Sequence, residues 1–212
     1  MKYVLLVLAS IGITHASELH PVDGRCGKGW NHWWSFLQSN AYADSEKLNY
    51  GPRGAQRVAL LKESLASSTF LAVSELKDTD SYLVCYAKTL RGLEPNENLE
   101  SLPLEIGHTL ISKELAAALN TAWLNKLKKT RYHLNSGQEA VFDGEACTLG
   151  GTSQDAPFLY FMGAFNLPAD VDLKWISEVG SHLIDLIKSK DTNKKSSVAS
   201  RIIVLLEKHQ IK

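Results

Sequence analysis

The chain has 212 residues, of which 44% are hydrophobic and 8% aromatic, and it carries 23 Lys and Arg side chains against 23 Asp and Glu. This composition excludes a disordered protein, which would combine low hydrophobicity with a high net charge. A net charge of zero also argues against binding nucleic acid through a broad basic surface. Three cysteines are too few for a disulfide-built scaffold, and no apolar run reaches the roughly 18 residues that stable membrane insertion requires.

The first residues have the layout of a secretory signal peptide. Lys2 gives a positive start, residues 4–13 form an apolar run, and the small residues Thr14 and Ala16 precede a possible cleavage point. An apolar stretch of this length is too short to span a bilayer but is typical of a signal peptide. The pattern predicts that residues 1–16 are removed after Ala16 and that the protein is periplasmic or secreted.

The N-terminal half begins with a helical pattern. Apolar residues lie on one helical face at Trp30, Trp33, Trp34, Leu37 and Ala41. Turn residues at 49–54 end this region, and a second helix is predicted from about Ala55, with Val58, Leu61 and Leu65 on one side. Strand-forming residues at 70–73 and 82–86 flank a polar loop, which favours a β-hairpin.

The C-terminal half alternates helices and strands. Ser112 is expected to cap a helix that runs to about Arg131, with Glu114 in its first turn and basic residues in its last. Apolar runs predict strands at 140–149 and 158–165. A further helix is expected to follow Asp170 or Asp172, with an apolar stripe at Ile176, Val179, Leu183 and Ile187.

These elements predict an α+β fold in which an antiparallel sheet of about four strands is covered by helices on one side. Residues 17–190 are expected to form a single globular domain, because this length suits one hydrophobic core. Residues 191–212 are expected to provide a polar linker and a C-terminal helix packed on that domain, the linker beginning near Lys188.

A short motif resembles a set of uncharacterised bacterial exported proteins. Trp123 lies on a predicted helix and is followed by the strand motif Phe142-Asp143-Gly144, with an apolar strand and a helix after Pro168. The chain departs from that set at Ala146-Cys147, where an aromatic residue is usual. The resemblance covers roughly residues 120–190 and implies the α+β fold, but it implies no activity.

The cysteines allow several pairings in an oxidising compartment. Cys85 and Cys147 both lie in predicted strands and are the preferred disulfide, which leaves Cys26 as the odd thiol. The alternative is that all three are free and buried.

Two groups of residues are candidates for catalysis. Glu178, His182 and Asp185 share one face of a predicted helix, and Glu105 with His108 would do so if that stretch were helical. A carboxylate beside an imidazole suits a metal ion or general acid–base chemistry. Cys147 with His133 and Asp143 is a weaker candidate for a nucleophilic thiol. Common enzyme motifs are absent from the sequence, so whether the protein is an enzyme stays open, and no cofactor or metal is expected.

The third group is aromatic and favours binding. Trp30, Trp33, Trp34 and Phe36 are more than one helical face can bury, so part of the cluster is expected to be exposed. Exposed aromatic rings stack on sugars or anchor protein partners. The leading hypothesis is therefore a non-enzymatic exported protein that binds another envelope or secreted protein or a carbohydrate, and not nucleic acid. The alternative is a small hydrolase or metal-dependent enzyme centred on the Glu178, His182 and Asp185 helix.

Overall fold

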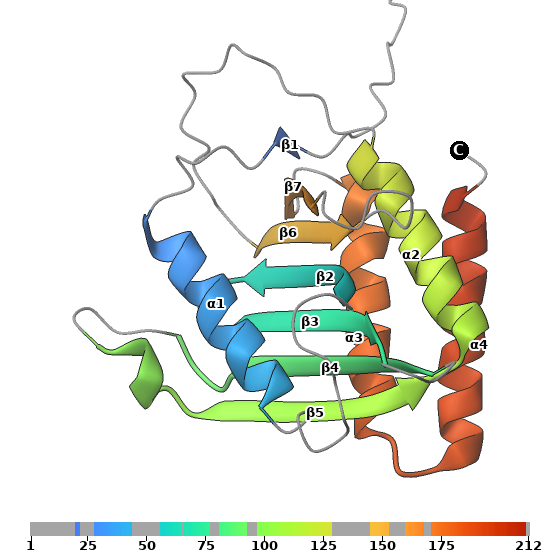
Figure 1. Cartoon of the computed structure of the whole chain (residues 1–212), viewed down its shortest axis with the longest axis horizontal. Helices are drawn as coiled ribbons and strands as arrows, with labels where there is room; N and C mark the ends of the chain where they lie inside the picture. Colours follow the sequence, from blue (N-terminus) through green and yellow to red (C-terminus); the bar gives the residue numbers. More distant parts are fainter. Residues whose placement is uncertain are drawn as a thin grey trace, which may run out of the picture.

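The computed structural model describes residues 20–21, 28–43, 56–64, 66–76, 81–92, 97–128, 145–152, 160–167 and 171–210. In this part of the chain an antiparallel sheet lies between helices (Figure 1). Its strands are β1 (His20–Pro21), β2 (Gln56–Glu63), β3 (Ser68–Glu75), β4 (Tyr82–Thr89), β5 (Leu104–Ile111), β6 (Glu145–Thr152) and β7 (Tyr160–Leu167). The α-helices are α1 (Lys28–Tyr42), α2 (Lys113–Lys128), α3 (Lys174–Lys188) and α4 (Thr192–Gln210).

The strand order is β1-β7-β6-β2-β3-β4-β5, and every pairing is antiparallel. This confirms the predicted α+β class with an antiparallel sheet packed against helices. The predicted hairpin is also confirmed, because β3 pairs with β4 from Thr69 and Lys88 to Glu75 and Tyr82. The sheet is wider than the four strands expected, since its seven strands also include β1, β2 and β5, and the β2 segment was predicted as a helix.

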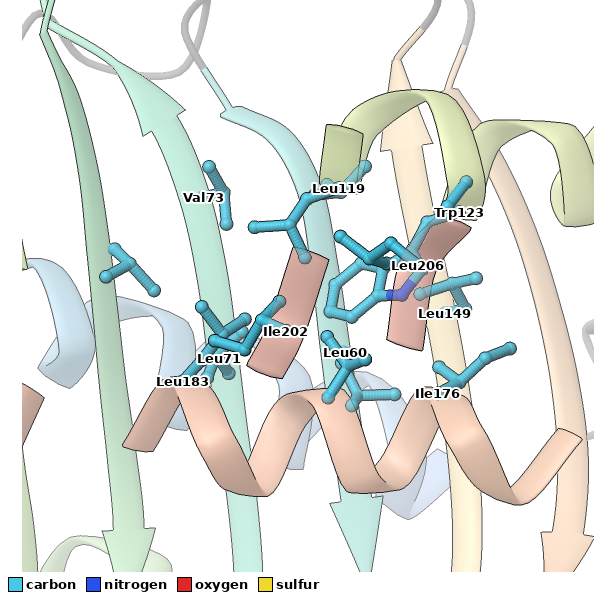
Figure 2. Close-up of a cluster of buried hydrophobic side chains, with 14 of the residues drawn as sticks. Leu60, Leu71, Val73, Leu119, Trp123, Leu149, Ile176, Leu183, Ile202 and Leu206 are labelled. Atoms are coloured by element: carbon cyan, nitrogen blue, oxygen red, sulfur yellow. The ribbon is translucent and has the colours of Figure 1, made fainter. Parts of the chain in front are cut away.

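Helices cover both faces of the sheet, whereas the sequence suggested one covered side. Helices α2, α3 and α4 pack on one face around Trp123, Leu60 and Leu71 (Figure 2). Helix α1 packs on the other face, where Leu37 lies against Leu61 and Phe70 of the same apolar cluster. The protein is therefore a three-layer structure, with the larger core on the side of α3.

Double coverage explains why β2 was predicted as a helix. Val58, Ala59, Leu60 and Leu61 are all buried, because alternate side chains enter the two opposite cores. Such a strand has a continuous apolar run instead of an alternating one, and periodicity alone cannot separate it from a buried helix. The helix predicted from Ala55 is therefore wrong, and pairing with both β3 and β6 makes this segment a central strand.

The helix ends agree in part with the sequence. The Ser112 hydroxyl accepts a hydrogen bond from the Leu115 amide at 3.3 Å, which confirms the predicted cap of α2. Helix α3 begins after Leu173, which provides no side-chain cap, and Asp172 lies in a preceding 3-10 turn (Val171–Leu173), so Asp172 is not the cap.

The C-terminal helix is longer than the sequence suggested. Asp191 caps α4 by accepting a hydrogen bond from the Asn193 amide at 2.8 Å, so the helix starts inside the polar stretch expected to be a linker. Val198, Ile202 and Leu206 then enter the same core as α2 and α3. The predicted signal peptide, Cys26, the turn at 49–54, His133, Asp143, Pro168 and Asp170 lie outside the described residues.

Candidate binding surface at the sheet edge

The aromatic helix contributes mainly to the core where its side chains are described. Trp34 is only 9% exposed and contacts Phe70 edge to face, with ring centroids 5.0 Å apart. Phe36 is half-buried against the same cluster, whereas the side chains of Trp30 and Trp33 lie outside the described residues. β3 provides the second apolar surface that covers most of the Trp34 ring, so the predicted contact role of Trp34 stays a prediction that the burial of its ring does not support.

The candidate histidine and carboxylate residues are divided between elements. Glu105 and His108 lie on strand β5, where a spacing of three places them on opposite faces, so the helical pairing is wrong. His108 pairs with Cys85 on the α1 face, away from α3. On α3, His182 Nδ1 lies 3.8 Å from Asp185 Oδ2 at the partly exposed helix surface. The side chain of Glu178 is directed to Lys174, 3.6 Å away.

Among the described residues, the histidine and carboxylate candidates do not come together at one place, and the Cys147, His133 and Asp143 candidate stays a prediction because His133 and Asp143 lie outside them. His182 and Asp185 are a local helix pair, and His108 belongs to a different layer. Within the described ranges, no three His, Cys, Asp or Glu side chains lie where they could hold a metal ion.

The cysteines of the preferred disulfide are far apart. Cys85 lies on β4 in the α1 core, and Cys147 lies on β6 in the opposite core. Strands β3 and β2 separate them, which gives about 14 Å at the usual strand spacing of about 4.8 Å. A disulfide needs Cα atoms within about 7 Å, so this fold does not allow the preferred pair. Burial raises the pKa of the Cys85 thiol to about 12.

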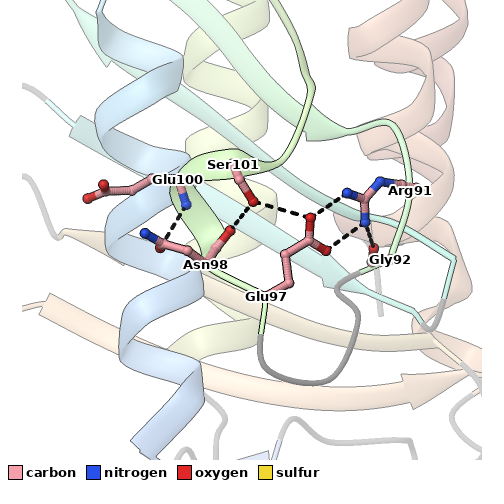
Figure 3. Close-up of polar contacts among 6 residues, drawn as sticks. All are labelled: Arg91, Gly92, Glu97, Asn98, Glu100 and Ser101. Atoms are coloured by element: carbon pink, nitrogen blue, oxygen red, sulfur yellow. Dashed lines mark hydrogen bonds and ion pairs between the residues drawn. The ribbon is translucent and has the colours of Figure 1, made fainter.

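The residues that gather on one open surface belong to strand β5, at one end of the strand order. A polar cluster holds the connection before it (Figure 3). Arg91 pairs with Glu97, and the Ser101 hydroxyl donates to the Asn98 carbonyl at 2.6 Å. Ser112, which caps α2, follows the strand directly. Both ends of β5 are therefore fixed by local hydrogen bonds.

The ladder with β4 determines which backbone groups of β5 face outward. The Leu90 amide donates to the Pro103 carbonyl at 3.0 Å, which makes this register position a hydrogen-bonded pair. Because such pairs alternate in an antiparallel ladder, Glu105, Gly107 and Thr109 bond to β4. The intervening residues, Ile106, His108 and Leu110, direct their amide and carbonyl groups to the outer side. No described strand pairs with that side.

The same outward residues carry side chains that α1 leaves uncovered. They lie on the α1 face, because Ile106 pairs with Ala87 and His108 with Cys85 of the α1 core. Ile106 is 38% exposed and Leu110 is 57% exposed, with exposed His108 between them. An eight-residue edge strand with exposed apolar side chains is a site where another strand readily pairs.

The opposite face of β5 is covered closely by the end of α3. Gly107 makes this possible, since a Cβ atom there would lie 2.8 Å from Tyr86 Cε1 and 2.9 Å from Ile187 Cγ2. The close approach brings Lys188 to the edge, where its Nζ lies 2.9 Å from Glu105 Oε1 and 5.8 Å from the centre of the Tyr86 ring. The hydrogen bond from Lys188 holds the pKa of the Glu105 carboxyl below its ordinary value.

A second lysine reaches the same face of the edge from α4. Lys195 Nζ donates to Thr109 Oγ1 at 3.0 Å. The two lysines therefore contact β5 on either side of Gly107. Burial, with the nearby Glu105 carboxylate, raises the pKa of Tyr86 to about 12, so the Tyr86 hydroxyl stays neutral beside them.

Sequence reasoning missed this surface although a signal was present. The segment Leu104–Ile111 alternates apolar and small or polar residues, which is the pattern of a half-exposed strand. The acid–histidine spacing of Glu105 and His108 drew attention to a helix instead. The sequence of this segment alone cannot show that it is the last strand of the sheet, since the strand order depends on pairings between segments far apart in the chain.

Comparisons with protein-family models, with curated proteins and with solved structures give no match to this chain. The resemblance to bacterial exported proteins stays a prediction from the Trp123 helix and the Asp143-Gly144 strand. Among the helices that the structure describes, none combines the length and the apolar character needed to cross a bilayer.

Proposed function

We propose that this protein is an exported, non-enzymatic binding protein that contacts another protein through strand β5. The observation that carries the proposal is the exposure of Ile106 and Leu110 on the same residues whose backbone groups face outward. A protein partner can satisfy both features together, because a strand offers amide and carbonyl groups and apolar side chains at matching intervals. The signal-peptide pattern of residues 1–16 supports an exported location.

This proposal moves the contact surface from the aromatic helix to the sheet edge. Trp34 belongs to the cover that α1 forms mainly over β3 and β4, whereas Ile106 and Leu110 of β5 stay exposed. The enzyme alternative finds less support, since His182 and Asp185 form a local pair on the surface of α3.

Site-specific photocrosslinking tests the proposal. The photoreactive residue p-benzoylphenylalanine replaces Leu110 in one version of the full chain and Val204 in a control version. Val204 is a suitable control, because it is 63% exposed but lies on α4. After irradiation of the producing cells, we expect the exported fraction to contain a heavier adduct from position 110 and none from position 204. Equal adducts from both positions, or none from position 110, would overturn the proposal.

A further inference from the structure

We propose that the partner adds an extended, acidic segment to β5 as an eighth strand of the sheet, with apolar and acidic side chains in alternation. This inference rests on the proposed function and names the class of partner. It follows from three features of the edge. These are the outward backbone groups, the exposed apolar side chains on the face covered by α1 (the front face) and the lysines on the face covered by α3 (the back face).

The backbone groups define an extended partner. Ile106, His108 and Leu110 direct amide and carbonyl groups away from β4 at every second residue. A strand placed about 4.8 Å beyond β5 would form hydrogen bonds with these groups, whereas a helix would leave them without protein partners. The eight residues of β5 give room for a segment of similar length.

The front face selects apolar side chains at alternate positions of the partner. Side chains opposite one another on neighbouring strands lie on the same face of a sheet. Partner residues on the α1 face would therefore lie beside Ile106 and Leu110, which are 38% and 57% exposed. Burying these exposed side chains stabilises the complex without any rearrangement of the core.

The back face selects acidic residues at the intervening positions. Lys188 and Lys195 contact Glu105 and Thr109 of β5, and the connection between α3 and α4 lies beside the same edge (Figure 1). In the sequence, residues 185–195 carry four lysines, Lys188, Lys190, Lys194 and Lys195, against two aspartates, Asp185 and Asp191, and Glu105 of β5 adds a third carboxylate. Carboxylates on the partner strand would complement this excess of positive charge.

The same charges disfavour a second copy of this chain as the occupant. A two-fold axis that extends the sheet antiparallel across β5 would place Lys188 and Lys195 of one copy near the same lysines of the other. Lysines on an edge strand are a known protection against self-pairing. The edge is therefore suited to a partner of opposite charge.

The test uses a fluorescent, end-capped peptide of seven residues that alternates glutamate and valine. We expect this peptide to bind the full-length mature protein in fluorescence anisotropy, and to bind at least about tenfold more tightly than a peptide that alternates lysine and valine. A third peptide, with the same glutamates and valines grouped in blocks, should bind as weakly as the lysine peptide, because it cannot place the two residue types on separate faces.

Variants of His108 separate strand addition from adsorption by charge. His108→Pro removes an outward amide and keeps the hydrogen bonds of the ladder with β4, so it should weaken binding at least about tenfold. His108→Ala keeps the amide and should bind within about threefold of the parent protein. If His108→Pro fails to fold, the same test can be made on the ligand. Two glutamate–valine peptides are N-methylated at alternate amides, one at the glutamates and the other at the valines. One of the two should lose binding, because only one set of amides faces β5.

Several results would overturn the inference. Equal binding of the lysine and glutamate peptides, or unchanged binding to His108→Pro, would exclude an acidic added strand. A protein that is already dimeric in sedimentation, and that His108→Pro makes monomeric, would identify a second copy as the occupant. A photocrosslinked adduct at position 110 without peptide binding would retain the proposed function and reject strand addition. Failure of both experiments would reject both.

Discussion

Among the residues that the structure describes, β1 contributes His20 and Pro21 to one edge of the sheet, whereas β5 contributes eight residues to the other edge. Pro21 has no amide hydrogen to donate to a further strand. The long edge offers alternate amide and carbonyl groups beside exposed Ile106 and Leu110. Natural proteins shorten or interrupt edges that must not pair, so the contrast supports the proposal that β5 is the edge that pairs.

Lysines add a second difference between the two edges. At β5, Lys188 and Lys195 contact the strand from α3 and α4. Such charges prevent pairing between identical edges but not pairing with an acidic strand. An open edge can therefore persist in a protein when its charge restricts which strand can join it.

The largest effect is expected from removing part of the cover that α1 forms over β3 and β4. Trp34→Ala deletes a ring that is 9% exposed and packs on Phe70, which should lower the free energy of unfolding by about 3–5 kcal/mol. Urea unfolding measures this, with exposed Ser35→Ala as a control that should change it by less than about 0.5 kcal/mol. A fully stable Trp34→Ala protein that no longer binds its partner would return the contact surface to α1.

A smaller loss of folding stability is expected from a substitution that pushes α3 away from strand β5. Gly107→Ala places a Cβ atom 2.8 Å from the Tyr86 ring and 2.9 Å from Ile187, so α3 must shift, at a cost of about 1–3 kcal/mol. His108→Ala, on the other face of β5, should change the free energy of unfolding by less than about 0.5 kcal/mol. Equal stability of the two variants would show that α3 does not press on β5.

These positions also show how far the sequence predicts the structure. The helix of Trp34, the cap at Ser112 and the β3–β4 hairpin could be predicted, because each depends on neighbouring residues. The helix predicted for β2 was wrong, since burial on both faces hides the strand period. The open edge at Gly107 could not be predicted, because it requires the complete strand order.

Thiol labelling tests whether the open edge is rigid or frays. Cys85 lies on β4, one strand from the edge, with no exposed surface and a pKa raised to about 12 by burial. Iodoacetamide at pH 8 should leave it unmodified in the native protein and modify it in urea, as peptide mass mapping can show. Buried Cys147 on β6 provides the comparison far from β5. Rapid native labelling of Cys85 alone would mean that α1 or β5 detaches from β4.

The smallest effect is expected from the ion pair at the edge. The partly exposed Glu105–Lys188 pair should contribute less than about 1 kcal/mol. Because the pKa of Glu105 is lowered in the folded protein, this contribution is present above the ordinary glutamate pKa and disappears as the pH falls through the lowered value. Glu105→Gln should therefore be slightly less stable than the parent protein at pH 7 and equal to it in acid. A difference that persists in acid would mean that charge is not the cause.

Residue-resolved amide hydrogen exchange tests the central claim most directly, namely that β5 is an open edge that receives a strand. In the free protein we expect fast exchange at Ile106, His108 and Leu110, and slow exchange at Glu105, Gly107 and Thr109, whose amides bond to β4. The glutamate–valine peptide should slow the first three and leave the others unchanged. Slow exchange at Ile106, His108 and Leu110 in the free protein, or fast exchange there in the complex, would contradict the account.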